Sequence, residues 1–480
     1  MSNVIWKPQP KQILMMSRAE DEGLYGGAAG GGKSDYLIAE ALRQVEIPNY
    51  RGLILRKTFP QLTDLIDRST EIYSKAFPKA KYNDSKHVWR FPSGAKIYFG
   101  SLQHAKDKYQ YQGKRYDFIG FDELTHFTWE EYSYLMSRNR AGGPGTRVYM
   151  RATANPGGVG HSWTKQRFVT ITQPYKTYVQ EVKAHDTAGK EFVQYRTRIF
   201  IPSSVFDNQE LLKNDPGYLA NLAMLPKAER DALLYGNWDS FSGQVFIEFT
   251  DNPEGYDSHE WTHVINPFRI PSNWLIYRGF DFGYTKPFSV GWYAVDERGC
   301  IYRIREMYGC VHDSPNTGVK LAPQAIAKDI LDVEVSDPNL KGRKIIGIAD
   351  PAIFDESHGE SIAAMMERAG TYWSPGDHTR LAGLMQYHYR LAFDTSGHAM
   401  FYVFNTCKEF IRTFPSLVYD DTHVEDINTD QEDHIYDECR YVLMEHPIAP
   451  RQNVAEKPPA EDPLDLWADK KKSEVQYFHM

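Results

Sequence analysis

The sequence predicts an α/β protein of two domains, and three observations support this fold class. Segments with strand character alternate with segments of helical period through the first half of the chain. A glycine-rich loop, residues 27–34, joins the first of these strands to the first helix. The second half begins again with three consecutive strands, and 480 residues is long for a single hydrophobic core.

The alternation of strands and helices in the first half predicts a mainly parallel sheet that helices cover on both faces. The expected strands are 22–27, 51–59, 116–124 and 146–156. The expected helices are 33–45, 60–77 and 128–140. Residues 86–101 are expected to form a hairpin around a Pro-Ser-Gly turn. From residue 157 to Trp238 the pattern is typical of irregular and more helical structure, which ends in a helix over 226–238.

The second half follows a linker rich in Gly, Asp and Ser, residues 239–260. Three antiparallel strands are expected over 274–284, 288–299 and 300–309. The elements expected after them are a helix over 322–335, a buried strand over 343–352, a strand over 399–404 and a late helix over 430–446. The predicted domains are 1–240, with a helical lid or linker part at about 156–240, then 241–449, and a C-terminal tail, 450–480, that is poorly ordered alone.

Composition narrows the class of protein. The net charge is −8, whereas proteins that coat nucleic acid are usually basic, so a passive DNA-binding module is disfavoured. Between Thr413 and Cys439 the chain has no Lys or Arg, which fits either an exposed acidic face or a site that binds metal ions. The cysteines are scattered without a CxxC pair, which favours a reducing cytosol over a zinc site or disulfide framework. No apolar run has the length of a membrane span, and a secretory signal is not expected.

The glycine-rich loop, from Gly27 to Ser34, fits the phosphate-binding pattern G-x-x-x-x-G-K-[ST]. Small residues between Gly27 and Gly32 let backbone N–H groups converge on phosphate oxygens, and the following helix directs its positive end to the same point. Lys33 would reach the β and γ phosphates, and Ser34 would bind Mg²⁺. The alternative is a flexible turn without a ligand, which the strand–loop–helix context disfavours.

A second acidic motif, Asp122-Glu123, ends the apolar strand 116–124. In a nucleotide-hydrolysing protein, Asp122 would hold the Mg²⁺ ion and Glu123 would polarise the attacking water. A lone motif of this kind is often only a strand end at the surface. Its order and distance after the phosphate loop favour the functional interpretation.

Two weaker signals leave alternatives open. Thr153 and Asn155 could sense the γ phosphate, although Asn-Pro-Gly-Gly also favours a turn by itself. Gln9 and Gln12 lie just upstream of the loop, where a Gln amide could pair with the N6 and N7 edge of adenine. Glutamines near an N-terminus are more often simply solvated.

Aspartates of the second half stand at positions suited to a metal site. Asp281 lies on the first strand, Asp350 ends the buried strand, and Asp433 and Asp437 share one face of the late helix. A buried carboxylate is costly unless it is neutralised. Carboxylates gathered at one end of a sheet can hold two Mg²⁺ or Mn²⁺ ions that cleave a phosphodiester, as in metal nucleases of the ribonuclease H type.

Each of these aspartates also has a structural interpretation. Asp281 and Asp350 could be turn residues at strand ends. Asp433 and Asp437 could be charges that suit the N-terminal end of a helix dipole. His434 could support the metal site from behind its ligands, although capping or packing is its more common role.

Together these residues resemble the large terminase subunit of tailed bacteriophages, a family that joins a DNA-packaging ATPase to a ribonuclease H-like nuclease. The resemblance extends over residues 6–446. Its motifs in chain order are LYGGAAGGGKSD, GLILRKTFPQL, YQGKRYDFIGFDEL, RATANPGGVGHSW, RGFDFGY, IADPA and DHIYDECRY. The last three resemble the nuclease motifs of the family and are more diagnostic than the phosphate loop, which many families share.

The resemblance implies roles for particular residues. It makes Gln12 an adenine contact, and Thr153 and Asn155 residues that couple hydrolysis to movement. The metal ligands that it implies are Asp281, Asp350 and Asp433, with Asp437 as a further candidate. The implied cofactors are ATP with Mg²⁺ in the first half and two Mg²⁺ or Mn²⁺ ions in the second. The family also uses an arginine finger, and the candidates here are Arg56, Lys114, Arg115, Arg138 and Arg140.

The function implied is an ATP-driven motor that moves double-stranded DNA into the procapsid and cuts concatemeric DNA. The implied partners are the portal protein and a small terminase subunit, in the host cell cytoplasm and without a membrane. The working form is a homo-oligomeric ring of five subunits on the portal, while the isolated chain could be a monomer. The alternatives are a helicase or repair translocase with a nuclease domain, a nucleotide-gated assembly protein that hydrolyses nothing, and a DNA-binding scaffold with structural carboxylates.

Overall fold

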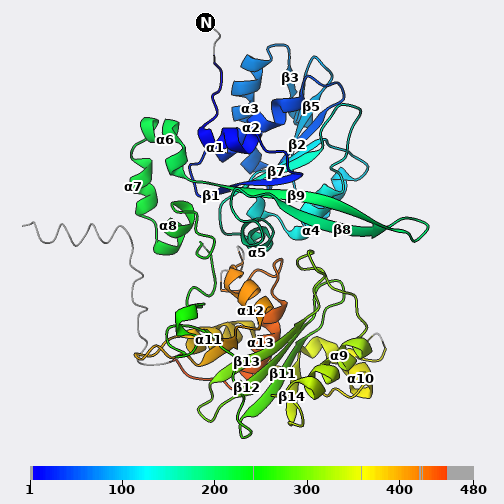
Figure 1. Ribbon diagram of the computed structural model, residues 1–480, viewed down its shortest axis with the longest axis vertical. Coiled ribbons are helices and arrows are strands. Elements are labelled where there is room, and N and C mark those ends of the chain that lie inside the picture. The colour runs from blue at the N-terminus through cyan, green and yellow to red at the C-terminus, as the bar shows by residue number, and fades with distance from the viewer. Residues whose placement is uncertain (1–3, 242, 358, 421–422, 424, 451–480) are drawn as a thin grey trace, which may run out of the picture.

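The computed structural model describes residues 4–241, 243–357, 359–420, 423 and 425–450. Its elements form two α/β halves, one above the other in Figure 1, each built around its own sheet. The tail predicted at 450–480 lies, apart from its first residue, outside the described residues. Among the helices in the described ranges, none combines the length and the apolar character needed to span a bilayer.

The first half contains a mainly parallel sheet, as predicted. Its strands are β1 (Glu22–Gly27), β2 (Arg51–Arg56), β3 (Lys81–Asn83), β4 (Val88–Arg90), β5 (Lys96–Ser101), β6 (Phe118–Phe121), β7 (Tyr149–Ala154), β8 (Tyr178–His185) and β9 (Glu191–Ser203). Their order across the sheet is β3-β4-β5-β2-β6-β7-β1-β9-β8. The strands from β5 to β9 in this order are parallel, while β3, β4 and β8 pair antiparallel at the two edges.

Helices cover both faces of this sheet. The helices of this half are α1 (Pro10–Met16), α2 (Lys33–Ala41), α3 (Thr63–Ala76), α4 (Trp129–Met136), α5 (His161–Thr164), α6 (Gln209–Asn214), α7 (Tyr218–Ala223) and α8 (Lys227–Leu233), of which α6 to α8 form a separate cluster beside the sheet (Figure 1). Successive strand residues point to opposite faces. One core cluster joins the strands to α2 and α3, and it includes Tyr25, Ile54, Leu37 and Ile72. A second cluster joins the other face to α4 and α5, and it includes Leu24, Leu53, Tyr132 and Trp163.

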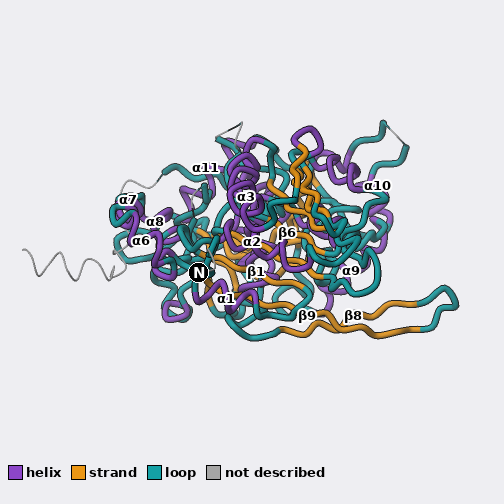
Figure 2. Tube along the Cα trace, turned by 90° about the horizontal axis from the view of Figure 1, so that it is seen from above, coloured by secondary structure: helices purple, strands orange, loops and turns teal. Residues whose placement is uncertain are grey.

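A long hairpin replaces the irregular, more helical structure expected after residue 157. β8 pairs antiparallel with β9 from Tyr178 opposite Arg198 to His185 opposite Glu191. The last residues of β9 also pair in parallel with β1, and the rest of the hairpin projects from the body (Figures 1 and 2). The helical prediction for 156–240 is therefore wrong over the hairpin, where the chain forms β8 and β9. The α-helices of this part are α5 to α8.

The second half has the strand arrangement that the resemblance implied. Its strands are β10 (Val264–Ile265), β11 (Leu275–Asp281), β12 (Ser289–Val295), β13 (Ile301–Tyr308), β14 (Ile345–Ala349), β15 (Ser374–Pro375) and β16 (Phe401–Phe404). Their order is β10-β16-β13-β12-β11-β14-β15, in which β13, β12 and β11 are antiparallel and β14 is parallel to β11.

The helices of the second half are α9 (Pro323–Ser336), α10 (Ile362–Arg368), α11 (Arg380–Leu391), α12 (Lys408–Thr413) and α13 (His434–Met444). α13 packs against β11, β12 and β14. Its buried residues Ile435, Cys439 and Val442 belong to the core cluster of this half. This packing fixes the start of α13 above the carboxyl end of β11, where two of the predicted site residues lie.

Candidate functional site

The glycine-rich loop runs from the end of β1 to the start of α2, as predicted. Gly27, Gly30 and Gly32 have φ angles of 126°, 73° and 71°, in the left-handed region that residues with a side chain rarely adopt. At Gly32 a Cβ atom would also lie 2.6 Å from Nε2 of Gln12. A side chain at position 32 would therefore strain the backbone and displace the amide of Gln12.

Side chains outside the loop bind three of its carbonyl groups. The pairs are Asn208 Nδ2 to Gly30 O at 2.8 Å, Tyr25 OH to Gly31 O at 3.0 Å and Gln12 Nε2 to Gly32 O at 2.8 Å. The C=O and N–H groups of a trans peptide point in opposite directions. These bonds therefore direct the N–H groups of the next residues, Gly31, Gly32 and Lys33, to the inside of the loop. The positive end of α2 lies at the same place, so the inside of the loop is a suitable binding site for an anion.

Lys33 joins the loop to the end of β7. Its ammonium donates to Ala28 O at 2.5 Å and to Asn155 Oδ1 at 2.7 Å. Burial lowers the pKa of the Lys33 ammonium, and the charges of Glu123 and Asp122 oppose that shift. A compact cation between the loop and two carboxylates is well placed to bind phosphate oxygens.

Asp122 is fully buried at the end of β6. It accepts hydrogen bonds from Ser34 Oγ at 3.2 Å, from Thr153 Oγ1 at 2.5 Å and from Arg56 Nε at 2.8 Å. The structure thus brings together Ser34, Asp122 and Thr153, which the sequence predicted from three separate motifs. The Ser34 hydroxyl and the Asp122 carboxylate fit Mg²⁺ chemically, because this ion prefers oxygen ligands.

Glu123 has a left-handed backbone, with φ 56° and ψ 63°. Its carboxylate accepts hydrogen bonds from Asn155 N at 3.1 Å and from Asn155 Nδ2 at 3.2 Å, and its backbone N–H donates to Thr153 Oγ1 at 3.2 Å. A backbone in this region is costly for a residue other than glycine and occurs most often at functional sites. Asn155 therefore bridges Lys33 and Glu123, and the three motifs that the sequence singled out meet in one network of hydrogen bonds.

Gln12 lies against the loop and not at the surface. Its side chain is buried, its Oε1 accepts from Gln9 N at 2.7 Å, and its Nε2 binds Gly32 as described. Gln9 contributes its backbone N–H to this contact. The adenine contact assigned to Gln12 stays a prediction, and the structure adds that Gln12 supports the loop itself.

The five candidates for an arginine finger separate into two places. The Arg56 guanidinium lies 2.6 Å from Asp122, close to the glycine-rich loop. The others lie beyond the opposite end of β6: Lys114 and Arg115 precede it, and the backbones of Arg138 and Arg140 bind Tyr116 there. A four-residue strand spans about 13 Å, so these four side chains belong to another edge of the sheet.

Sequence reasoning missed Asn208, which holds the loop from the opposite side. Asn208 precedes α6, and its Oδ1 accepts from Leu211 N at 3.3 Å while its Nδ2 binds Gly30. The signal was present, since Asn followed by Gln-Glu-Leu-Leu is typical of a helix start. The contact with the loop could not be predicted, because Asn208 and Gly30 are 178 residues apart in the chain.

The aspartates of the second half meet at one edge of the second sheet, as predicted. Asp281 is the last residue of β11, and Asp350 follows β14, its parallel neighbour, with Asp350 N donating to Phe280 O at 3.0 Å. Carboxyl ends of parallel strands lie at the same sheet edge. Asp433 directly precedes α13, which packs against β11.

Each of these aspartates is affected by the negative charge of the others, as the pKa values show. Burial raises the pKa of Asp281 to about 6, and the nearby Asp437 and Asp350 add to this while His434 opposes it. Burial raises the pKa of Asp433 to about 7, with Asp437 and Asp281 adding to it. Ionised carboxylates that lie close together repel each other, and a bound cation relieves this repulsion.

Among the described residues, no group of three or more His, Cys, Asp or Glu side chains is arranged to hold a metal ion. The donor chemistry still fits Mg²⁺ or Mn²⁺, because Asp281, Asp350 and Asp433 all offer carboxylate oxygens at the same edge.

Asp437 has partners that distinguish it from the other aspartates. It accepts from Arg440 Nε at 3.1 Å and Nη2 at 2.8 Å, and Arg380 Nη1 lies 3.9 Å away. An aspartate held in a two-point ion pair is less free to bind a metal. The structure therefore favours Asp437 as an anchor for two arginines beside the site.

His434 contacts the site directly. Its Nδ1 lies 3.3 Å from Asp281 Oδ2, and its Nε2 lies 3.1 Å from Asn316 Oδ1. Burial alone would lower the pKa of His434, but the hydrogen bond and charge of Asp281 raise it. The supporting role considered for His434 matches this geometry, whereas Asn316 carried no signal in the sequence.

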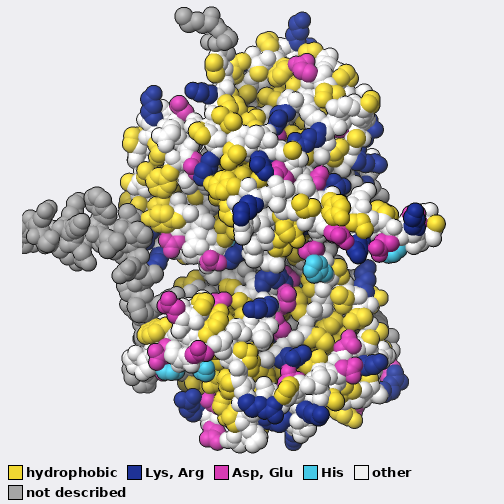
Figure 3. Space-filling view, in the orientation of Figure 1, with side chains coloured by type: hydrophobic (Ala, Val, Ile, Leu, Met, Phe, Trp, Pro, Cys, Tyr) yellow, Lys and Arg dark blue, Asp and Glu magenta, His cyan; other side chains and the backbone are white. Residues whose placement is uncertain are grey.

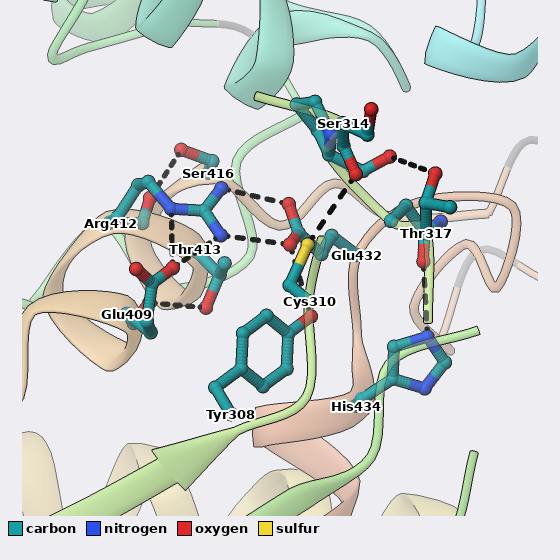
Figure 4. A network of polar contacts seen from close by, with 12 residues as sticks. Tyr308, Cys310, Ser314, Thr317, Glu409, Arg412, Thr413, Ser416, Glu432 and His434 are labelled. Carbon is teal, nitrogen blue, oxygen red and sulfur yellow. Dashed lines mark hydrogen bonds and ion pairs between the residues drawn. The ribbon is translucent and has the colours of Figure 1, made fainter. Parts of the chain in front are cut away.

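A buried ion pair fixes the residue before Asp433. Glu432 accepts from both terminal nitrogens of Arg412 at 2.8 Å, and from Tyr308 OH at 3.0 Å (Figure 4). Burial raises the pKa of Glu432 on its own, but the charge and hydrogen bonds of Arg412 lower it below its usual value. Asp433 therefore starts α13 from a rigid support.

The first half of the chain matches a known protein family. Residues 24–250 match the family model described as terminase large subunit, T4likevirus-type, N-terminal. No curated protein matches the chain. Among solved structures, the large terminase of a thermophilic bacteriophage is 15% identical, with 91% of this chain and 98% of that chain covered and a TM-score of 0.38. The bacteriophage HK97 large terminase is 9% identical, with 92% and 94% covered and a TM-score of 0.47.

The P22 large terminase nuclease domain is 18% identical, with 42% of this chain and 92% of that chain covered and a TM-score of 0.29. Because these TM-scores are below 0.5, the three likenesses support no statement about function. The family match covers the glycine-rich loop, Asp122-Glu123, Thr153 and Asn155. The resemblance to the large terminase subunits is thereby confirmed over residues 24–250, which match the family model of their N-terminal part.

Proposed function

We propose that this protein is an ATP-driven DNA-packaging motor with an attached metal-dependent endonuclease. The observation that carries the proposal is the network in which Asn155 joins Lys33 of the phosphate loop to Glu123 of the acidic motif. Binding of a γ phosphate by Lys33 would disturb its bond to Asn155, and through Asn155 the position of Glu123 and the end of β7. Hydrolysis and movement are thus connected by one side chain.

In the ATPase half, the inward N–H groups of the loop and Lys33 bind the phosphates, and Gln12 faces the adenine. Ser34 and Asp122 would hold Mg²⁺, which neutralises phosphate charge when it is bound. Glu123 polarises the attacking water, and Asn155 orients the Glu123 carboxylate. Arg56 beside Asp122 supplies positive charge at the same end of the sheet.

In the nuclease half, Asp281, Asp350 and Asp433 would hold two Mg²⁺ or Mn²⁺ ions, which activate water and stabilise the leaving 3′ oxygen when they are bound. The three carboxylates present their oxygens from two strands and a helix start. Asp437 orients Arg440 and Arg380 beside them. The substrate class is double-stranded DNA, and cleavage of concatemers would begin and end packaging.

The proposed domain limits are 1–240 for the ATPase, 241–449 for the nuclease and 450–480 for the tail. The proposed partners are the portal protein, a small terminase subunit and further copies of this chain in a ring of five, in the host cell cytoplasm. Charged side chains of both signs are interspersed over the face in Figure 3, so a partner on that face would meet no single-sign patch.

The test is cleavage of supercoiled plasmid by the purified chain with Mg²⁺ or Mn²⁺ and with EDTA. The variants are Asp350→Ala, Lys33→Ala and a control, Asp355→Ala, which changes an exposed aspartate on the same loop. We expect metal-dependent cutting that is lost with Asp350→Ala and kept with the other two. Cutting by Asp350→Ala at the wild-type rate, or no cutting by the wild type, would favour the alternative of an assembly or DNA-binding scaffold without nuclease activity.

A further inference from the structure

A loop of the second half reaches across to the first half. This bridging loop, residues 311–317, follows β13 and is closed by Val311 N donating to Thr317 O at 2.8 Å. Asn316 and Thr317 form part of the wall of a cleft of about 1010 Å³ between the halves, opposite Lys57 and Trp129. A change in the angle between the halves would therefore act on this loop.

The first half holds the bridging loop through Asp313. Gln180 Nε2, on the β8–β9 hairpin, donates to Asp313 Oδ2 at 2.7 Å. Burial lowers the pKa of Arg198 on β9, and the charges of Glu22 and Asp313 oppose that shift. Asp313 thus lies near a buried cation of the first half, in addition to its hydrogen bond with the hairpin.

The same loop holds the nuclease site through Asn316. Asn316 Nδ2 donates to Gln431 O at 3.1 Å, and Asn316 Oδ1 lies 3.1 Å from His434 Nε2. Because a backbone carbonyl can only accept, the amide orientation is fixed, and Oδ1 must accept from the Nε2–H group of His434. The other ring nitrogen then faces Asp281 at 3.3 Å. The imidazole is held from both sides.

The backbone conformation at position 316 restricts which residues could replace Asn316 in its contacts with Gln431 and His434. Its φ is 56°, in the left-handed region where Asn, Asp and Gly are tolerated and most other residues are strained. Asn at this position therefore combines a permitted backbone with a side chain that both donates to Gln431 and accepts from His434.

We propose that Asn316 is a positioning residue of the nuclease site, which holds His434 against Asp281, and that its loop takes its position from the ATPase half through Gln180 and Asp313. The proposal rests on the proposed nuclease function. It makes the geometry around Asp281 depend on how the two halves dock, because the chain of contacts runs from Gln180 through the bridging loop and His434 to Asp281.

The first test compares Asn316→Gly with Asn316→Asp in the full chain. Both substitutions permit the left-handed backbone, but only Asp keeps an acceptor for His434. For Asn316→Gly we expect the plasmid cleavage rate at saturating DNA to fall about 10-fold or more, in the range seen when groups that orient metal ligands are removed. The DNA concentration for half-maximal rate and the ATP hydrolysis rate should stay unchanged. Asn316→Asp keeps the acceptor for His434 but loses the donor to Gln431, so its cleavage rate should fall less than that of Asn316→Gly.

The outcomes separate the two proposals. If the wild type does not cut, the proposed nuclease function fails. If the wild type cuts and Asn316→Gly cuts equally fast, or Asn316→Asp loses as much as Asn316→Gly, the positioning role of Asn316 is wrong.

The second test addresses the connection between the halves. Gln180→Ala removes the bond to Asp313, and Gln194→Ala changes an exposed residue of the same hairpin as a control. We expect Gln180→Ala to lower the cleavage rate several-fold relative to Gln194→Ala, without any change in ATP hydrolysis. Equal cleavage by the two variants would overturn the role of the hairpin contact.

Discussion

Asn155 binds Glu123 twice, through its backbone N–H at 3.1 Å and its side-chain amide at 3.2 Å. The Oδ1 atom of the same amide accepts from Lys33 at 2.7 Å. A single residue thus orients the carboxylate expected to polarise water and the ammonium expected to bind phosphate. Its backbone directly follows β7, so any change in the network reaches the sheet directly.

We predict that Asn155→Asp keeps the contact of this side chain with Lys33 and removes its contact with Glu123. An aspartate still accepts from Lys33, but its charge repels the Glu123 carboxylate. Steady-state ATP hydrolysis should fall about 10-fold or more, because a misplaced catalytic group loses the benefit of orientation. Binding of a fluorescent ATP analogue should be nearly unchanged. Hydrolysis at the wild-type rate would show that the Asn155–Glu123 contact does not orient the carboxylate for hydrolysis.

Glu123→Gln tests the catalytic role of the carboxylate at constant shape. Gln retains the length of the side chain but cannot accept a proton, so the turnover number for ATP should fall by about 10²–10⁴. Nucleotide binding should persist. A nucleotide-gated assembly protein that hydrolyses nothing predicts unchanged function for the same variant, so a packaging assay beside the hydrolysis assay distinguishes the two.

Because the backbone of Glu123 is left-handed, we predict that a glycine variant at this position is more stable than an alanine variant. Glycine adopts φ 56° without strain, whereas alanine is destabilised by about 1 kcal/mol or more there. Glu123→Gly should therefore unfold at a higher temperature than Glu123→Ala, although both lack the carboxylate. Differential scanning calorimetry of the two variants measures this difference. The opposite order would mean that this backbone relaxes when the side chain is removed.

We predict that the burial of His161 makes the free energy of unfolding fall as the pH is lowered. It is buried, accepts from Gly157 N at 2.9 Å through Nδ1, and faces Trp238 O at 3.1 Å through Nε2. Burial lowers the pKa of His161 from 6.5 to about 3. Between these values the unfolded chain binds a proton that the folded chain does not, so the free energy of unfolding falls by up to about 1.4 kcal/mol per pH unit below 6.5.

His161→Gln is the matched variant for this effect. Gln can accept from Gly157 and donate to Trp238, but it does not titrate. Between pH 6.5 and pH 5 the wild type should lose more stability than the variant, as measured by urea unfolding at each pH. Parallel losses in the two proteins would mean that His161 takes up its proton without unfolding.

The ion pair between Glu438 and Arg303 predicts a large effect of one buried substitution. Both side chains are fully buried, at 2.8 Å, and Glu438 also accepts from Tyr293 OH at 2.7 Å. Glu438→Gln leaves the buried Arg303 charge with only its longer contact to Glu306, at 3.5 Å, and should cost about 3–5 kcal/mol in the unfolding of the second half. The control is Glu360→Gln, whose exposed pair with Arg368 should cost less than about 1 kcal/mol. Similar costs for the two variants would contradict the prediction.

Most elements could be predicted because their signals are local. The glycine loop, the apolar strand before Asp122 and the periodic helix after Asp433 each contain their own pattern, and each forms where it was expected. The β8–β9 hairpin was missed because its outer part is exposed on both faces. A strand that buries neither face has little apolar alternation to detect, so its pairing with β1 through β9 decides its structure.

The sequence by itself determined the order of the motifs, the α/β class and the residues that can carry the chemistry, because these depend on composition, spacing and local backbone preference. Only the tertiary structure decided that Asn155 joins Lys33 to Glu123, that Asn208 holds the loop, and that Asn316 reaches His434 from a loop more than 100 residues away. These contacts join residues far apart in the chain, and no local pattern encodes a distance between them. They arise when packing brings strand ends and loops to the same edge of a sheet.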